Sequence, residues 1–440
     1  MNENEEYEIE DVPETDFTKS DDNFFEKINE KELCDFEESL FETTEEYLDM
    51  YMSEYSKPDF NIILIKKITD HYYGEWLDAE LCEPSDFDEI FDFIQHFVEK
   101  YLESMEDELP PRQCINTHMI CVQDKQIIMD KIKGLRSQYQ PEQRTQEWHD
   151  FRHNLMTASN LHKAVGSEAQ RNSLIYEKCK PLSQSQDRVN YYAPNARQWG
   201  NIYEPISIML YEYLYKTKVE DFGCIQHTKY SCIGASPDGI NTDPESLRFG
   251  RMIEVKNIVN REITMTPKEE YWIQMQIQME TCDLDECDFI ETRFKECENK
   301  DDFYDLVNEP SVTKGVYLCL LERRLNGVDV LLFNNNVPKY IYMPIQPVLT
   351  KEDIEAWIDQ IKYDYRETHI IYTTHFWYLD EFSCILVKRN KLWFAAVVPQ
   401  ILDTWKIIED ERIHGYEHRA PKKRTTNETN TGFKSIIKLD

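Results

Sequence analysis

Apolar residues recur every three or four positions in three stretches of the first hundred residues, 22–55, 59–73 and 85–102. This spacing places apolar side chains on one face of a helix, and that face must pack against another element. We therefore predict a helical accessory region at residues 21–110, for which partner docking or DNA mimicry is a second interpretation. Residues 1–20 are acidic and poor in aliphatic side chains, so we predict a disordered tail there.

A Pro-Pro pair ends this pattern and opens residues 111–142, which we predict to form a connecting helix and linker. Beyond it, Ser159 is a candidate cap for a short helix at 160–165. A helix start presents free N–H groups and the positive end of the helix dipole, so Arg152, Thr157 and Ser159 can form a phosphate pocket. Taken alone, Ser and Thr at helix starts are more typical of simple caps, and a single Arg is more typical of a surface ion pair.

Residues 198–214 have the apolar stripe of an amphipathic helix. Pro205 fits the first turn of that helix, so Glu204 is predicted to lie at its start. A carboxylate there is stabilised by the helix dipole. A purely stabilising role for Glu204 is therefore the alternative to a chemical one.

Candidate chemistry concentrates in a turn at 234–240 and a strand at 251–259. Asp238 lies on the turn between a proline and a glycine. Side chains alternate along a strand, so Glu254 and Lys256 point to the same face. Two carboxylates meeting there are costly to hold without a cation, and their oxygens are ligands that Mg²⁺ prefers. Mg²⁺ beside carboxylates and a lysine suits hydrolysis of a phosphodiester.

Residues 273–279 alternate like a strand, but residues 266–269 read as a capping box with a proline at the first helical position. These signals favour a helix over a strand. The helix would place Tyr271, Gln274 and Gln278 on one face.

The rest of the chain carries no chemistry that its residue types identify. We predict strands at 289–294, 315–322, 329–333, 383–388 and 391–398, and helices at 351–363 and 401–413. The last two strands would pair with each other. Residues 419–440 form a basic, flexible tail that can contact phosphate or be inert.

Net charge is −35, and residues 1–60 carry 22 Asp and Glu against 4 Lys and Arg. An acidic surface repels nucleic acid, so DNA binding would need a local basic groove. No apolar run is long enough to span a membrane, and the acidic start argues against a secretory or transit peptide. The 12 cysteines include no CxxC pair, which predicts reduced thiols. Cys282, Cys287 and Cys297 are the closest group, and buried thiols are favoured there over a zinc or iron–sulfur site.

The order of the motifs is more specific than any one of them. It runs through Trp148, Arg152, Thr157-Ala-Ser159, Trp199-Gly200, Tyr203-Glu204, Ser236-Pro-Asp-Gly, Glu254-Val-Lys256, Tyr271 and Gln274-Met-Gln276. This order resembles the lambda-exonuclease (YqaJ viral recombinase) family of the PD-(D/E)xK nuclease superfamily. The resemblance covers about residues 143–293 and resumes near 380–413. It implies an α/β (α+β) fold with a restriction-endonuclease-like core, in which a small mixed central sheet is flanked by helices.

The resemblance leaves out the N-terminal helical region and an insertion at 294–376, after which residues 377–418 would complete the core. It implies that Asp238 and Glu254 bind metal, with the Val255 carbonyl as a further ligand and the helix-borne Glu204 in support. The cofactor would be Mg²⁺, as two ions, with Mn²⁺ able to substitute.

The remaining matches also imply roles. Lys256 would orient or deprotonate the attacking water, and Gln274 would lie near the metal site. Arg152, Thr157 and Ser159 would grip the phosphate at the 5′ end of the DNA.

Together these roles imply a Mg²⁺-dependent deoxyribonuclease, a 5′-to-3′ exonuclease on double-stranded DNA used in viral recombination, replication or genome processing. A structure-specific endonuclease or resolvase on the same fold is one alternative, and a catalytically silent scaffold with an acidic docking region is another. The expected partners are double-stranded DNA and a single-strand annealing protein, and some relatives form a ring-shaped trimer. The large insertion and acidic extension suggest a large DNA virus. The expected location is then the host cytoplasm or nucleus, a viral factory or the virion, with no secretion and no membrane.

Overall fold

The structure is a computed structural model that describes residues 24–117, 124–143, 145–182, 196–307, 309, 311–323 and 338–421. The chain divides into two compact units. Unit 1 comprises Met1–Tyr55 and Asp59–Asp107, and unit 2 comprises Ser56–Pro58 and Glu108–Asp440. Among the helices in the described ranges, none combines the length and the apolar character needed to cross a bilayer.

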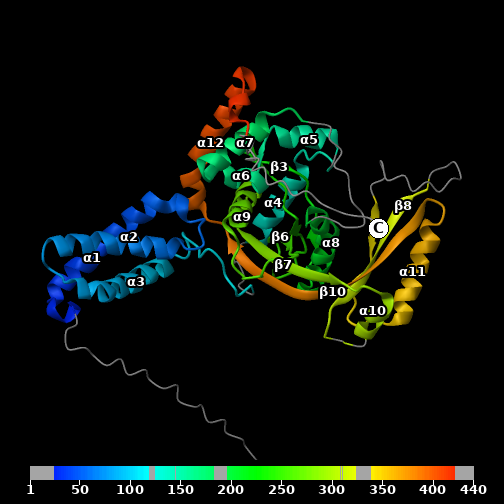
Figure 1. Cartoon of the computed structure of the whole chain (residues 1–440), viewed down its shortest axis with the longest axis horizontal. Coiled ribbons are helices and arrows are strands. Elements are labelled where there is room, and N and C mark those ends of the chain that lie inside the picture. The colour runs from blue at the N-terminus through cyan, green and yellow to red at the C-terminus, as the bar shows by residue number, and fades with distance from the viewer. Residues whose placement is uncertain are drawn as a thin grey trace, which may run out of the picture. The chain divides into compact units, whose positions relative to one another are not determined.

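Unit 1 is helical (Figure 1). Its elements are η1 (Phe24–Lys27), α1 (Glu30–Tyr51), η2 (Met52–Glu54), α2 (Phe60–Asp78), η3 (Pro84–Asp86) and α3 (Phe87–Ser104). Asn29 caps α1, since its side chain accepts the backbone N–H of Glu32 and the Glu32 carboxylate accepts the N–H of Asn29. Each helix buries one stripe completely, as at Leu40, Ile68 and Ile90. The three amphipathic stretches predicted from the sequence are these three helices.

Unit 2 contains a seven-stranded sheet in the order β2-β5-β6-β7-β10-β8-β9. The strands are β2 (Val219–Glu220), β5 (Gly239–Asn241), β6 (Met252–Asn257), β7 (Glu286–Glu296), β8 (Lys314–Glu322), β9 (Lys339–Tyr342) and β10 (His369–Lys388). β6 and β7 run parallel and the other neighbours run antiparallel, so the sheet is mixed, as predicted. A separate three-stranded sheet has the order β1 (Met156–Thr157), β4 (Ile233–Ala235), β3 (Ile225–Gln226).

Helices cover both faces of β6. The α8 face of the strand is apolar, because Ile253 and Val255 pack with Tyr211 of α8 (Ala196–Tyr215). The opposite face meets α9 (Glu269–Cys282), which contacts Glu254. Figure 1 shows β6 between these two helices. The other helices of unit 2 are α4 (Lys125–Ser137), α5 (Gln146–His153), α6 (Ala158–Val165), α7 (Glu168–Cys179), α10 (Lys300–Val307), α11 (Lys351–Tyr365), α12 (Lys391–His414) and η4 (Glu417–Arg419).

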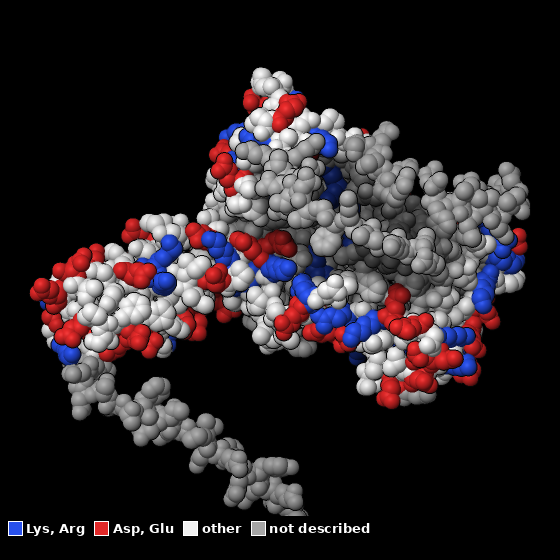
Figure 2. All heavy atoms as spheres, in the orientation of Figure 1, with Lys and Arg blue, Asp and Glu red and all other residues white. Residues whose placement is uncertain are grey.

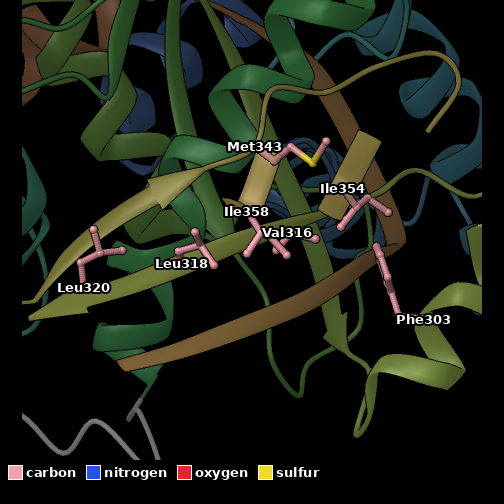
Figure 3. Close-up of a cluster of buried hydrophobic side chains, with 7 residues drawn as sticks. All are labelled: Phe303, Val316, Leu318, Leu320, Met343, Ile354 and Ile358. Atoms are coloured by element: carbon pink, nitrogen blue, oxygen red, sulfur yellow. The ribbon is translucent and has the colours of Figure 1, made fainter. Parts of the chain in front are cut away.

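The predicted insertion extends the main sheet. β10 is 20 residues long, and one half pairs with β7 while the other half pairs with β8. β8, β9, α10 and α11 then form a local core, drawn in Figure 3: Phe303, Val316, Leu318, Leu320, Met343, Ile354 and Ile358. The long strands β7 and β10 therefore belong both to the sheet around β6 and to the extension that the predicted insertion forms.

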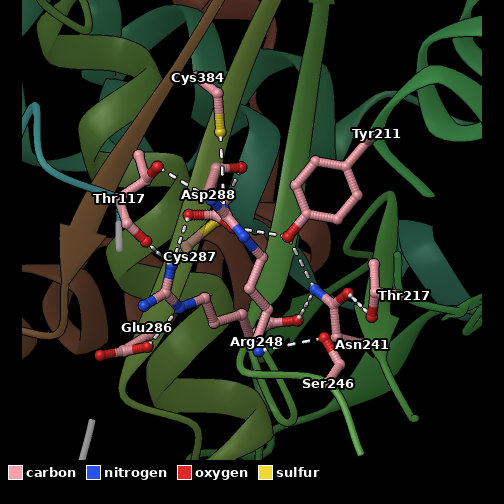
Figure 4. A network of polar contacts seen from close by, with 11 residues as sticks. Thr117, Tyr211, Thr217, Asn241, Ser246, Arg248, Glu286, Cys287, Asp288 and Cys384 are labelled. Atoms are coloured by element: carbon pink, nitrogen blue, oxygen red, sulfur yellow. Dashed lines mark hydrogen bonds and ion pairs between the residues drawn. The ribbon is translucent and has the colours of Figure 1, made fainter. Parts of the chain in front are cut away.

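A buried polar network fixes the starts of β6 and β7 on the α8 face (Figure 4). Arg251 donates to Glu286 at 2.6 Å and to Asp288 at 3.3 Å, and it also donates to the Thr117 carbonyl at 2.7 Å. Arg248 forms a second ion pair with Asp288. Because the charged partners are almost completely buried, each depends on the others for its pairing.

One prediction at the end of the core is wrong. Residues 391–398 do not form a strand but the first turns of α12, which continues through the predicted helix at 401–413. The apolar run resembles a strand, but the Asn390 side chain accepts the Trp393 N–H at 2.8 Å and starts the helix. Pro399 then lies inside a helix that packing maintains.

Three further details differ from the sequence predictions. α8 begins at Ala196, so Pro205 and Glu204 lie in its interior and Glu204 does not stabilise a helix start. α9 forms as predicted, but its N-cap is Lys268 with no side-chain capping bond. α6 begins at residue 158 with Thr157 at its N-cap, so Ser159 lies inside the helix.

The predicted strand at 329–333 and the tail from residue 422 lie outside the described residues, as does the tail at 1–20.

Candidate active site

Glu254 is the centre of the cluster that the sequence singled out. It lies on β6 and is 1% exposed. Its Oε1 accepts Gln274 Nε2 at 2.8 Å and its Oε2 accepts Gln278 Nε2 at 2.7 Å. The two glutamines are four residues apart on α9, so both reach the same carboxylate. The Lys256 ammonium forms an ion pair with Glu254 from the same face of β6.

Asp238 joins this cluster from the turn before β5. Its Oδ2 accepts the Val255 N–H at 2.7 Å, which ties the turn to β6. Burial raises the pKa of Asp238 well above its ordinary value, and the negative charges of Glu254 and Glu204 raise it further. Glu204, on α8, is therefore close enough for its charge to act on Asp238. The structure thus ties Asp238 to the strand that carries Glu254.

The Lys256 ammonium offsets the negative charge of the neighbouring carboxylates. Burial alone would lower its pKa, but the carboxylates of Glu254 and Asp238 outweigh burial and raise the pKa above the ordinary value. Lys256 also lies over the Tyr271 ring, with Nζ 4.9 Å from the ring centroid. The side chain is held as an ammonium.

The donor set suits a hard divalent cation, because buried carboxylates that raise one another's pKa are relieved by positive charge. The acids are not arranged as a ready ligand shell. Over the described residues, no three or more His, Cys, Asp or Glu side chains are placed to hold a metal ion. Their oxygens instead accept hydrogen bonds from the protein, as at Glu254 and Asp238. The residue types fit Mg²⁺, and binding would require Lys256 to leave the Glu254 oxygen that it contacts.

The predicted phosphate-pocket residues lie beside the same turn. Arg152 projects from α5, and its Nη1 donates to Ser236 Oγ at 3.1 Å. Its guanidinium also lies 4.6 Å from the Trp148 ring centroid. Thr157 pairs in register with Gly234 of β4, the strand that leads to Ser236. The Thr157 and Ser159 hydroxyl oxygens are 3.3 Å apart.

Two residues of this region were not predicted as site residues. Gln278 bridges the two groups, since Nε2 donates to Glu254 and also to the Ser236 carbonyl at 3.3 Å. The Ser236 hydroxyl accepts the hydrogen bond that Arg152 donates. Gln278 could have been predicted from its spacing with Gln274 on one helix face. Ser236 could have been predicted from its position two residues before Asp238.

Two members of the cysteine group are buried and Cys297 is partly exposed. Cys282 and Cys287 are buried, and burial raises the pKa of both thiols. Cys282 ends α9, Cys287 is the second residue of β7 and Cys297 follows the end of β7. None of the three is part of a metal-holding cluster within the described ranges.

Charge is distributed unevenly along the chain. Residues 1–107 carry 35 of the 84 acidic residues but only 7 of the 49 basic ones. Residues 108–440 are therefore nearly balanced, with 49 acidic and 42 basic residues. Figure 2 shows acidic side chains spread over α1 to α3, and basic side chains among the acidic ones over the part that contains the sheet. The repulsion of nucleic acid expected from the net charge thus arises chiefly outside the part that contains the cluster.

Comparisons with known proteins show which proteins the part of the chain with this cluster resembles. Residues 147–285 match the model of the YqaJ-like viral recombinase domain. An uncharacterized protein of Acanthamoeba polyphaga mimivirus is 28% identical over 304 residues, which are 62% of this chain and 53% of that protein. The matched region thus spans about half the length of this curated relative.

Solved exonuclease structures are also similar. An alkaline exonuclease from Laribacter hongkongensis is 20% identical, with a TM-score of 0.35, and the match covers 61% of this chain and 95% of the other. A phage-related exonuclease from Haemophilus somnus is 15% identical, with a TM-score of 0.30, and covers 58% and 94%.

The family model begins at Glu147, next to Trp148 at the start of the motif order, and ends at Asp285, after α9. It therefore contains every residue that the sequence proposed for the site. The viral relative agrees with the viral origin expected from the sequence. Residues 147–285 are accordingly similar to the YqaJ-like viral recombinase domain, which is the resemblance that the order of motifs predicted.

Proposed function

We propose that this chain is a metal-dependent deoxyribonuclease that digests double-stranded DNA from its 5′ ends. The observation that carries the proposal is the convergence of Asp238, Glu254 and Lys256 on one end of β6, with Gln274 and Gln278 holding Glu254. The match to a viral recombinase domain supports the same class of reaction.

Asp238, Glu254 and the Val255 carbonyl would hold the cation, with Glu204 in support. When bound, Mg²⁺ supplies Lewis-acid polarisation of the phosphate and a more acidic water. The chain's own residues set the geometry. The Val255 N–H fixes the Asp238 carboxylate, and the two glutamine amides fix both oxygens of Glu254. This rigidity favours catalysis, because groups that are already oriented need no rearrangement in the transition state.

Lys256 would act on the attacking water and on the phosphate. Its raised pKa favours the ammonium form, which donates hydrogen bonds to a water or a phosphate oxygen. In that form it orients the water and offsets negative charge in the transition state. Removal of the water's proton by Lys256 would need a lower pKa, which a cation bound at the neighbouring acids would produce.

The group around Arg152 is what favours an exonuclease over an endonuclease. Arg152 and the hydroxyls of Ser236, Thr157 and Ser159 can grip a terminal phosphate near the acids. In Mg²⁺ the chain should therefore digest a linear duplex and leave a covalently closed circular duplex of the same sequence intact. Nicking or linearisation of the circle at a comparable rate would favour the endonuclease interpretation. Absence of turnover on both substrates would favour the silent scaffold.

Arg152→Ala should reduce digestion of 5′-phosphorylated ends more than digestion of 5′-hydroxyl ends. A charge-assisted contact of this kind changes kcat/KM by roughly ten- to a hundredfold, and the hydroxyl end does not use it. Initial rates on the two duplexes give the ratio. Arg136→Ala is the matched control, because Arg136 is half exposed and pairs with Glu220. An equal loss on both ends for Arg152→Ala would remove the phosphate pocket from the account.

Double-stranded DNA is the partner that this proposal requires. A single-strand annealing protein and a trimeric assembly remain predictions from the family resemblance. Both can be examined by mixing experiments and by measurement of the mass of the chain in solution.

A further inference from the structure

The inserted segment 294–376 reaches the helix that carries Glu204. Tyr342, on β9, donates its hydroxyl to the Ile202 carbonyl of α8 at 2.8 Å. Tyr203, also on α8, donates its hydroxyl to Glu296 at the end of β7 at 2.7 Å. Both contacts lie within two residues of Glu204. The part of α8 beside Glu204 is therefore attached to β9 and to the end of β7, at residues that the family resemblance does not include.

Glu296 contacts residues of several elements at this place. It accepts the Tyr317 hydroxyl of β8 at 2.9 Å as well as the Tyr203 hydroxyl, and His375 of β10 lies 3.0 Å from its other oxygen. His375 stacks on Tyr317 with ring centroids 4.4 Å apart. Three strands and one helix thus meet at one carboxylate.

The interior of α8 needs such support beside Glu204. Pro205 has no N–H, so the helical hydrogen bond to the Asn201 carbonyl is missing immediately beside Glu204. On the other side, Asn257 of β6 donates to the Gly200 carbonyl at 3.1 Å. Asn257 follows Lys256, so the strand with the site lysine and the helix with the third acid are joined directly.

We infer that the inserted strands position Glu204 for metal binding, through the Tyr342–Ile202 and Tyr203–Glu296 hydrogen bonds. This inference rests on the proposed function, since it assigns the insertion a role at the same site. Tyr342 and Tyr203 are positioning residues: Tyr342 contacts α8, Tyr203 anchors α8 to Glu296, and neither is assigned to the reacting atoms. Loss of either hydroxyl would let the first turns of α8 move relative to Asp238 and Glu254.

The test uses Tyr342→Phe and Tyr203→Phe in the full chain. Each change removes one hydroxyl and keeps the ring. Mn²⁺ affinity is measured by calorimetry without DNA, and kcat is measured across a Mg²⁺ titration with linear duplex. We expect Tyr342→Phe to bind Mn²⁺ roughly fivefold more weakly, as for loss of one neutral hydrogen bond. Tyr203→Phe should weaken binding at least as much, because its hydroxyl donates to a carboxylate. At saturating Mg²⁺, kcat should return to within about twofold of the unaltered chain. A merely structural role would not produce rescue by metal.

Tyr304→Phe is the matched control. Tyr304 lies in the same insertion, on α10, and its hydroxyl contacts Glu355 of α11 at 3.2 Å. This variant should bind Mn²⁺ like the unaltered chain.

The inference is overturned if Tyr342→Phe and Tyr203→Phe bind Mn²⁺ as tightly as the unaltered chain while that chain binds metal and cleaves DNA. It is also overturned if they lose kcat at saturating Mg²⁺ with unchanged affinity. A chain that takes up no Mn²⁺ and cleaves no DNA would contradict the proposed function itself, and the inference with it.

Discussion

Replacing Glu254 with glutamine is expected to lower DNA hydrolysis by roughly a thousandfold, because the change removes a negative charge where positive groups converge. The carboxylate accepts from Gln274 on one oxygen and from Gln278 on the other, and it pairs with Lys256. A glutamine side chain keeps the volume but offers one donor group where two acceptors are needed. It also supplies no negative charge to a divalent cation. Initial rates on a linear duplex in Mg²⁺ measure the loss.

A matched carboxylate tests whether the effect is local. Glu220→Gln alters an acid on β2 that pairs with Arg136 near the surface, and its activity should stay within about twofold of the unaltered chain. Near-ultraviolet circular dichroism should show that both variants remain folded. Substantial activity in a folded Glu254→Gln variant would contradict the assignment of Glu254 to the metal site.

Arg251→Met is expected to cost about 3–5 kcal/mol of unfolding free energy, since it removes one partner of a buried ion-pair network. Arg251 pairs with Glu286 and Asp288 at the starts of β6 and β7 and also donates to the Thr117 carbonyl. Methionine fills part of the space but leaves buried carboxylates with fewer partners. Urea unfolding followed by fluorescence gives the change in midpoint.

The exposed Arg136–Glu220 pair provides the comparison for stability. Arg136→Ala should change the unfolding free energy by less than about 1 kcal/mol, because exposed ion pairs contribute little. A loss for Arg251→Met no larger than that of Arg136→Ala would show that the buried network does not depend on this guanidinium.

Local sequence signals were sufficient to predict the central cluster of Asp238, Glu254 and Lys256. The turn that carries Asp238 and the alternation of Glu254 and Lys256 along one strand depend only on neighbouring residues. Their meeting was predictable because strand and turn are close in sequence. The α9 face that presents Gln274 followed from helical spacing, although the expected cap at its start is not formed.

Long-range packing explains what the sequence did not reveal. Nothing near Ser236 in the sequence indicates that Arg152, 84 residues away, donates to its hydroxyl. Asn390 starts α12 because it and Trp393 are buried against other elements, which overrides the strand-like pattern that follows. The local preference of Pro205 predicts a helix start close to it, whereas contacts on both sides maintain α8 through it.

The central claim is that the acids around β6 form a metal-dependent site for phosphodiester hydrolysis. The most direct measurement is the release of labelled nucleotides from a 5′-phosphorylated linear duplex by the purified chain, with Mg²⁺ and then with excess chelator. We predict release that rises with Mg²⁺ to saturation, stops with chelator and resumes when Mg²⁺ is restored. Release that continues undiminished with chelator, or no release at any Mg²⁺ concentration, would contradict the account.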